Sequence, residues 1–111
     1  MKRILIVEDD VDVCLDMAEM LRNFGFSTAT AFNGKEAIDF LNSEHGLPDF
    51  VLMDLHMPHM DGWELHAHIK ADKRLKDISV IVISGDQAGA EMGTEFLMKP
   101  LNVQHLTKIL N

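Results

Sequence analysis

The apolar positions of the chain fall into short continuous runs that alternate with stretches of helical periodicity. A continuous apolar run is typical of a strand buried on both faces, whereas apolar residues three or four apart indicate one face of a helix. We therefore predict strands at residues 3–7, 50–53, 80–83 and 95–98, and we also predict a short second strand at residues 27–31. We predict helices at residues 11–24, 35–43, 62–71 and 103–110. Alternating strands and helices favour an α/β fold, with a parallel sheet covered by helices on both faces.

Local signals mark the ends of these elements. The first helix carries an apolar stripe made of Val11, Leu15, Ala18, Leu21 and Phe24. Gly25 is placed to end that helix, since glycine readily adopts the left-handed conformation that terminates helices. We interpret Asp10 as the N-cap of this helix and Asp61 as part of an Asp61-Gly62 turn that begins a later one.

Composition limits the class of protein. At 111 residues, with 47% hydrophobic and 25% charged residues, the chain is expected to be one globular domain, 1–111, without an effector domain. No apolar run approaches the length of about 18 residues that a membrane helix needs. The lone Cys14 and the absence of a signal-peptide pattern favour a cytoplasmic protein. A net charge of −8 argues against direct binding of nucleic acid.

Acidic residues and one lysine stand where predicted strands end. Glu8 and Asp9 follow the first strand, Asp54 closes the third, and Lys99 follows the fifth. Because the carboxyl ends of parallel strands meet in one crevice, we expect these groups to converge. Gathered carboxylates repel one another, and a hard divalent cation such as Mg²⁺ relieves that repulsion. With the ammonium group of Lys99 as a second positive charge, the pattern predicts a site that handles a phosphoryl group.

Four segments, taken in order, carry a resemblance to a known family. They are ILIVEDD at 4–10, MDLHMPHMDG at 53–62, VISG at 82–85 and FLMKP at 96–100. Together they resemble the receiver domain of two-component response regulators, of the chemotaxis-regulator type, over essentially the whole chain. The resemblance implies a flavodoxin-like fold with the strand order 2-1-3-4-5.

The resemblance also implies an active site. Asp54 matches the residue that accepts a phosphoryl group from a phosphohistidine on a histidine kinase or a phosphotransfer protein. Glu8 and Asp9 match the acidic pair that binds Mg²⁺ together with Asp54, and Asp9 is expected to be the direct ligand of the pair. The backbone carbonyl of His56 is expected to complete the protein's share of the metal ligands.

Further matches concern the switch that follows phosphorylation. Ser84 and Lys99 match the hydroxyl and the ammonium group that bind phosphoryl oxygens, and Phe96 matches an aromatic residue that rotates inward as Ser84 moves. Between Ser84 and Lys99 only the segment Gly85–Met98 intervenes. That is about 7 residues, or two helical turns, fewer than the family normally has. We therefore expect the family's fourth helix to be short or absent, with consequences for the surface that passes on the signal.

Other interpretations of the sequence assign the chain a different function. A receiver fold can serve as an interaction module that ignores phosphorylation, and the chain is either a stand-alone regulator or a piece of a larger protein such as a hybrid kinase. A metal-dependent phosphohydrolase commonly has a second aspartate two residues after its nucleophile, where this chain has His56. We do not expect this protein to be an enzyme that acts on an external substrate. A zinc site built from His56, His59, His66 and His68 is disfavoured. The first two lie on either side of Pro58 in a turn, and the last two lie on different faces of a predicted helix.

Overall fold

The computed structural model describes residues 2–44, 46–57, 60–85, 95–99 and 101–111, apart from the side chain of Val103. In chain order the elements are β1 (Arg3–Val7), α1 (Val11–Asn23), β2 (Ser27–Ala31), α2 (Gly34–Leu41), β3 (Phe50–Asp54), α3 (Gly62–Ala71), β4 (Ser79–Ser84), β5 (Glu95–Met98) and α4 (Val103–Leu110). The five strands form one parallel sheet in the order β2-β1-β3-β4-β5. The predicted flavodoxin-like topology is therefore confirmed.

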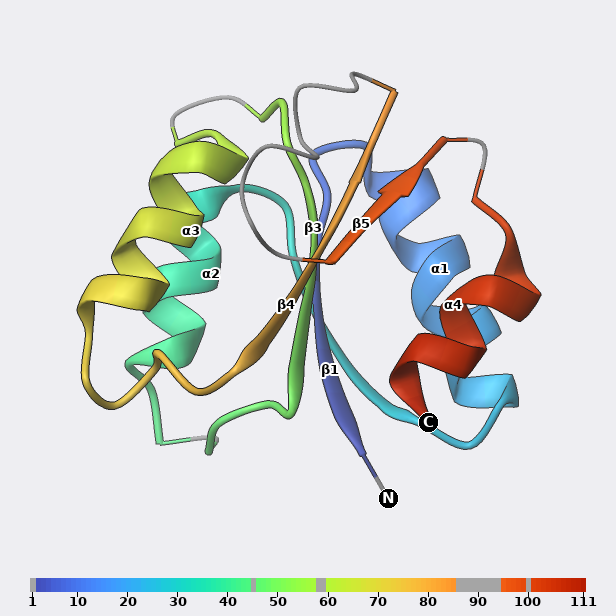
Figure 1. Cartoon of the computed structure of the whole chain (residues 1–111), viewed down its shortest axis with the longest axis horizontal. Coiled ribbons are helices and arrows are strands. Elements are labelled where there is room, and N and C mark those ends of the chain that lie inside the picture. Colours follow the sequence, from blue (N-terminus) through green and yellow to red (C-terminus); the bar gives the residue numbers. More distant parts are fainter. Residues whose placement is uncertain (1, 45, 58–59, 86–94, 100) are drawn as a thin grey trace.

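The sheet is the middle layer of the molecule. In Figure 1, α2 and α3 cover one face and α1 and α4 cover the other. Successive side chains of β1 point to opposite faces, so Leu5 and Val7 pack into the cluster beneath α2 and α3, while Ile4 and Ile6 pack beneath α1 and α4. Each of these four side chains is at most 1% exposed. This two-sided burial explains why the strand reads as a continuous apolar run.

The apolar stripe predicted for α1 is partly wrong. The residues that α1 buries are Cys14, Ala18 and Leu21, which lie at helical spacing on one face. Three of the predicted positions are exposed instead, namely Val11, Leu15 and Phe24. Leu15 follows the buried Cys14 directly and is rotated by about 100° from it around the helix axis. Val11 begins the helix and Phe24 is its C-cap, so both lie at helix ends.

Helix ends agree closely with the local signals. The side chain of Asp10 accepts a hydrogen bond from the Val13 amide at 3.2 Å, and Asp61 accepts one from the Glu64 amide at 3.0 Å. Each therefore satisfies a backbone N–H that the helix itself leaves unpaired. Gly25 has a φ of 95°, and its amide donates to the Arg22 carbonyl at 2.9 Å, which closes α1 as predicted.

The connection between β4 and β5 is short. Ser84 ends β4 and Glu95 begins β5, and the residues 86–94 that link them lie outside the described part of the chain. Within the described residues there are four helices, and α4 is the closing helix that follows β5. The expectation that the family's fourth helix is short or absent fits these four described helices, and the residues where that helix would stand lie outside the described part of the chain. None of the helices in the described ranges is long and apolar enough to cross a membrane.

Candidate functional site

The predicted site residues all lie at the carboxyl edge of the sheet. Glu8 directly follows β1, Asp54 is the last residue of β3, Ser84 is the last of β4, and Lys99 directly follows β5. The register aligns these ends, since Asp54 lies opposite Ile83, next to Ser84 in the chain. Parallel strands thus bring together residues that are up to 91 positions apart in sequence.

Three carboxylates form the centre of the site. Glu8, Asp9 and Asp54 each offer an oxygen, and these oxygens lie within 4.8 Å of one another. Glu8 is only 3% exposed, whereas Asp9 is exposed and Asp54 lies between these extremes. Converging oxygen ligands with one open side suit a small, hard cation that retains water molecules, as Mg²⁺ does. Within the described residues this is the one cluster of three or more potential metal-ligating side chains.

Lys99 provides the positive charge of the site. Its Nζ lies 3.2 Å from Asp54 Oδ2 and 3.5 Å from Glu8 Oε1. Its backbone amide donates to the Ser84 carbonyl at 2.9 Å, which extends the β4–β5 pairing by one residue. The lysine side chain remains 40% exposed, so its ammonium group contacts the carboxylates and still reaches solvent.

The electrostatics reflect crowding of like charges. Burial raises the pKa of Glu8 to about 7, and hydrogen bonds to Asp9 and Asp54 and the negative charge of Asp54 add to this effect. Lys99 partly offsets it. Burial alone would lower the pKa of Lys99, but the charges and hydrogen bonds of Asp54 and Glu8 outweigh it and raise that pKa. The carboxylates thus compete for too little positive charge, which favours binding of a cation.

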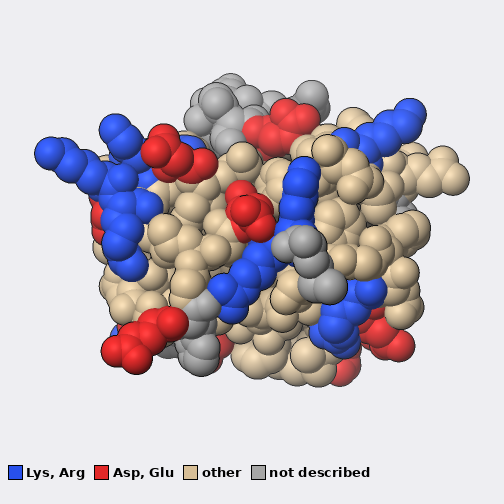
Figure 2. Space-filling view, turned by 90° about the horizontal axis from the view of Figure 1, so that it is seen from below, with Lys and Arg blue, Asp and Glu red and all other residues tan. Residues whose placement is uncertain are grey.

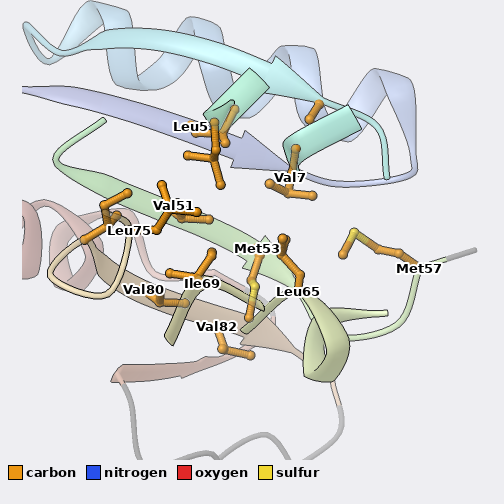
Figure 3. Close-up of a cluster of buried hydrophobic side chains, with 14 of the residues drawn as sticks. Leu5, Val7, Val51, Met53, Met57, Leu65, Ile69, Leu75, Val80 and Val82 are labelled. Carbon is orange, nitrogen blue, oxygen red and sulfur yellow. The ribbon is translucent and has the colours of Figure 1, made fainter. Parts of the chain in front are cut away.

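The loop after β3 orients Asp54. The backbone N–H of His56 donates to Asp54 Oδ1 at 3.3 Å, while the His56 side chain is exposed. Leu55 and Met57 on either side are buried, and Figure 3 shows Met57 reaching from this loop toward the cluster beneath α2 and α3. The loop is thus anchored in the core on both sides of His56. That the His56 carbonyl binds metal remains a prediction.

The predicted switch residues lie on β4 and β5. Ser84 is 1% exposed at the end of β4. Phe96 pairs with Val82, two residues before Ser84, and packs half-buried against the cluster beneath α2 and α3. Phe96 therefore lies on the face of the sheet that α2 and α3 cover (Figure 1). Movement of either residue on phosphorylation stays a prediction.

The histidines do not gather around a metal in the described part of the chain. His66 is half-buried on α3, where burial and then the nearby Lys70 lower its pKa. His56 and His68 are exposed, and His59 lies outside the described residues. None of the described histidines belongs to the acidic cluster. Gly62, predicted only as part of a turn and the start of a helix, also lies close to the site, since its amide donates to the Leu55 carbonyl at 2.7 Å.

Comparison with known proteins gives a consistent result. The family model described as "Response regulator receiver domain" matches residues 4–111. The transcriptional regulatory protein PdtaR of Mycobacterium tuberculosis is 33% identical over 111 residues, which cover 95% of this chain and 53% of that protein. The chain thus spans about half the length of this curated relative.

Two solved structures are similar over nearly the whole chain. The receiver domain of a signal transduction histidine kinase from Syntrophus aciditrophicus has a TM-score of 0.88 and 31% identity, covering 99% of this chain and 87% of that one. The response regulator TrrA from Thermotoga maritima, solved in complex with Mg²⁺-BeF, has a TM-score of 0.86 and 29% identity. That match covers 99% of this chain and 96% of TrrA.

Proposed function

Since the chain belongs to the family of response regulator receiver domains, we propose that it accepts a phosphoryl group on Asp54 and acts as a two-component signalling switch. The observation that carries this proposal is the pairing of Asp54 Oδ2 with Lys99 Nζ at 3.2 Å, inside a cluster that also contains Glu8 and Asp9. It combines a nucleophilic carboxylate, a cation for the phosphoryl oxygens and a set of metal ligands at one sheet edge.

The transfer step requires little chemistry from the protein. An oxygen of the Asp54 carboxylate forms a bond to phosphorus while the phosphorus–nitrogen bond of a phosphohistidine breaks. The electron pair of that bond returns to the imidazole, which takes up a proton from solvent. Aspartate is ionised at neutral pH, so no general base is needed to activate it. Catalysis then depends on alignment and on positive charge around the phosphoryl oxygens.

Separate residues supply that charge and alignment. Glu8, Asp9 and Asp54 would hold Mg²⁺ with the His56 carbonyl, and the ion supplies charge stabilisation for the phosphoryl oxygens when bound. Lys99 would bind one phosphoryl oxygen with its ammonium group. The Ser84 hydroxyl would donate a hydrogen bond to another. Hydrolysis reverses the state, because water attacks phosphorus and releases the Asp54 carboxylate, inorganic phosphate and a proton.

The proposed partners follow from the same chemistry. The donor is a phosphohistidine on a histidine kinase or a histidine phosphotransfer protein. Phosphorylation of Asp54 would draw Ser84 toward the phosphoryl group and let Phe96 fill the space behind it. This would change a protein-interaction surface near β4 and β5. We propose no enzymatic action beyond the protein's own phosphorylation and dephosphorylation, and a cytoplasmic location remains our expectation.

A phosphorylation assay with a matched control tests the proposal. The protein is incubated with acetyl phosphate and Mg²⁺, and intact mass is measured for one added phosphoryl group. Asp54→Asn should lose the adduct. Asp10→Asn, which alters a nearby aspartate but keeps a good N-cap for α1, should retain it.

Binding of beryllofluoride provides a second readout. We expect beryllofluoride and Mg²⁺ together to raise the melting temperature of the wild type but not of Asp54→Asn. An adduct that is independent of Mg²⁺, or that persists in Asp54→Asn, would place the phosphoryl group elsewhere. If neither an adduct nor a beryllofluoride response is found, the fold serves as an interaction module instead.

A further inference from the structure

The loop between β3 and α3 makes an unusually close approach to a glycine at its far end. Gly62 begins α3, and its amide donates to the Leu55 carbonyl at 2.7 Å. A Cβ added at Gly62 would lie 2.8 Å from the Asp54 carbonyl oxygen and 2.8 Å from the Leu55 Cα. Both contacts are to backbone atoms, which cannot rotate away as a side chain can. Any side chain at position 62 would therefore displace the backbone that carries Asp54.

A second glycine contacts the same loop from a different helix. Gly34 begins α2, and a Cβ placed there would lie 2.7 Å from Met60 Cβ and 2.8 Å from the Met60 carbonyl oxygen. Met60 is half-buried and packs against the cluster beneath α2 and α3. The start of α2 has no side chain at this contact, so the loop backbone lies directly against it.

The start of α2 is held too firmly to recede from such a contact. The Asn33 side chain accepts from the Glu36 amide at 2.8 Å, and the Glu36 side chain accepts from the Phe32 amide at 2.7 Å. These two bonds fix the first turn of the helix much as a capping box does, except that Glu36 binds the amide of Phe32, one residue before the N-cap. A methyl group at position 34 would therefore push on Met60 rather than move α2. The described parts of the loop, 55–57 and 60–62, would shift with it.

We propose that Gly34 and Gly62 are positioning residues that hold the Asp54 loop between the starts of α2 and α3. Gly34 acts through Met60, and Gly62 acts directly on the backbone of Asp54 and Leu55. This inference rests on the proposed function, because the geometry they maintain is that of Asp54 and of the His56 carbonyl as ligands of Mg²⁺. Gly34 was no part of the predicted site, since it is 20 residues from Asp54 in the chain.

A merely structural role predicts a different outcome. Loss of packing lowers the melting temperature but leaves the ligand geometry of the molecules that remain folded. A positioning role alters metal choice as well, because Mg²⁺ demands near-ideal octahedral geometry whereas Ca²⁺ accepts irregular sites. A shifted loop should therefore weaken Mg²⁺ binding more than Ca²⁺ binding. The ratio of the two affinities separates the two roles.

The experiment compares Gly34→Ala and Gly62→Ala with Gly25→Ala by calorimetric titration of Mg²⁺ and of Ca²⁺. Gly25 has a φ of 95° and open space around it, so alanine there strains the backbone far from the loop. We expect the Mg²⁺ affinity of Gly34→Ala and Gly62→Ala to fall by about tenfold or more, as when residues that support metal ligands are changed. Their Ca²⁺ affinity should fall less. Gly25→Ala should melt at a lower temperature and bind both ions as the wild type does.

Met60→Ala serves as a second variant that adds no atoms and so avoids a folding failure from a clash. It should also weaken Mg²⁺ binding relative to Ca²⁺ binding, because the loop loses the Met60 side-chain atoms beyond Cβ that pack it against the cluster beneath α2 and α3. If the wild type binds Mg²⁺ and Gly34→Ala and Met60→Ala bind it within about twofold of the wild type, positioning is overturned while the proposed function stands. A parallel loss of both ions also overturns it. Failure of the wild type to bind Mg²⁺ would contradict the proposed function itself.

Discussion

The two edges of the sheet are built by the same strands and helices, yet they use charge differently. At the carboxyl edge, the carboxylates of Glu8, Asp9 and Asp54 converge within 4.8 Å. The amino edge receives the carboxyl ends of the helices, where Arg22, Lys70 and Lys108 lie in last turns. Figure 2 views the molecule from the amino edge and shows Lys and Arg side chains in several places over it, with carboxylates among them. At the carboxyl edge, by contrast, the strand ends direct three carboxylates to one point.

The lysines and arginines at the two edges also have different partners. At the amino edge, Lys2 Nζ donates to the Leu110 carbonyl at 2.8 Å, and Arg74 donates to the Leu41 carbonyl at 2.9 Å. These contacts satisfy carbonyl groups at helix ends, which is a structural role. Lys99 instead faces two carboxylates. A lysine or arginine at a sheet edge is therefore identified as functional by the groups that it contacts, which are carboxylates for Lys99 and helix-end carbonyls for Lys2 and Arg74.

A cavity at the amino edge sharpens the contrast. It has a volume of about 660 Å³ and is lined by residues that include Phe50, Lys76 and Glu95. Within the described residues, no cluster of three or more potential metal-ligating side chains occurs there. The charges of the candidate site therefore converge elsewhere, and cavity size does not identify that site.

Removal of the Lys99 charge should have the largest effect of the variants that test this comparison. We expect Lys99→Ala to slow phosphorylation of Asp54 by acetyl phosphate by about 100-fold, as when a donor to developing charge is removed. Binding of Mg²⁺ in the absence of phosphodonor should become somewhat tighter, because the competing ammonium group is gone. Phosphorylation reactions quenched at successive times measure the rate, and titration with Mg²⁺ measures the affinity for the metal. Equal rates for Lys99→Ala and the wild type would contradict the assigned role.

The raised pKa of Glu8 predicts a second effect, on stability. A carboxyl group whose pKa is raised from 4.5 to about 7 in the folded state keeps its proton longer there than in the unfolded chain. The folded state binds more protons in this window, so the free energy of unfolding falls as pH rises from about 4.5 to about 7. We expect a loss of up to about 3 kcal/mol without metal, given that one pKa unit is worth about 1.4 kcal/mol.

Denaturant unfolding at pH 5 and pH 8 measures this loss. Glu8→Gln should remove most of it, since glutamine does not titrate. Added Mg²⁺ should restore stability at pH 8 and do little at pH 5, where Glu8 is protonated. The carboxylates do not compete in this way if the free energy of unfolding of the wild type is the same at pH 5 and pH 8 and Glu8→Gln behaves as the wild type does.

His56 should have a smaller effect, on the lifetime of the phosphorylated state. Its exposed side chain lies two residues after Asp54, at the rim of the site. Our hypothesis is that this ring limits access of water to the phosphoryl group. His56→Asn should then shorten the lifetime of phospho-Asp54 by a few-fold, which release of inorganic phosphate over time measures. An unchanged lifetime would remove His56 from the mechanism, and exposed His68→Asn on α3 serves as the control.

Changes at the amino edge should have the smallest effects. Lys73 and Lys76 are exposed and follow α3. The double variant Lys73→Ala/Lys76→Ala should change the free energy of unfolding by only about 0.5 kcal/mol, as is usual for surface positions. Its Mg²⁺ affinity and rate of phosphorylation should equal those of the wild type. A marked loss of phosphorylation would show that the amino edge takes part in the chemistry.

Much of the fold could be predicted because each local signal has a local cause. Continuous apolar runs marked β1, β3 and β4, and the cap residues Asp10 and Asp61 bind the amides of the helices that they begin. The stripe of α1 was harder to predict. Val11 and Leu15 are as apolar as the residues that α1 buries, and only the position of the helix on the sheet leaves them exposed.

The candidate site also has some properties that could be predicted from the sequence and others that could not. The identities of Glu8, Asp9, Asp54 and Lys99, and their placement at strand ends, could be read from the chain, because a parallel sheet brings carboxyl ends to one edge. The raised pKa of Glu8 and the contact between Gly34 and Met60 could not be read in this way. Both depend on distances and burial set by packing of elements that are remote in sequence.

The sequence by itself therefore determined the order of the elements, the family and the residues that carry the proposed chemistry. The order of the elements follows from periodicity and turn chemistry, which act over a few positions, and the family and the residue roles follow from the resemblance that four segments carry. The tertiary structure alone decided which helix residues are buried, how closely the carboxylates approach and which glycines hold the Asp54 loop. Those properties arise where segments meet across the fold, and the free energy of such contacts depends on their three-dimensional arrangement.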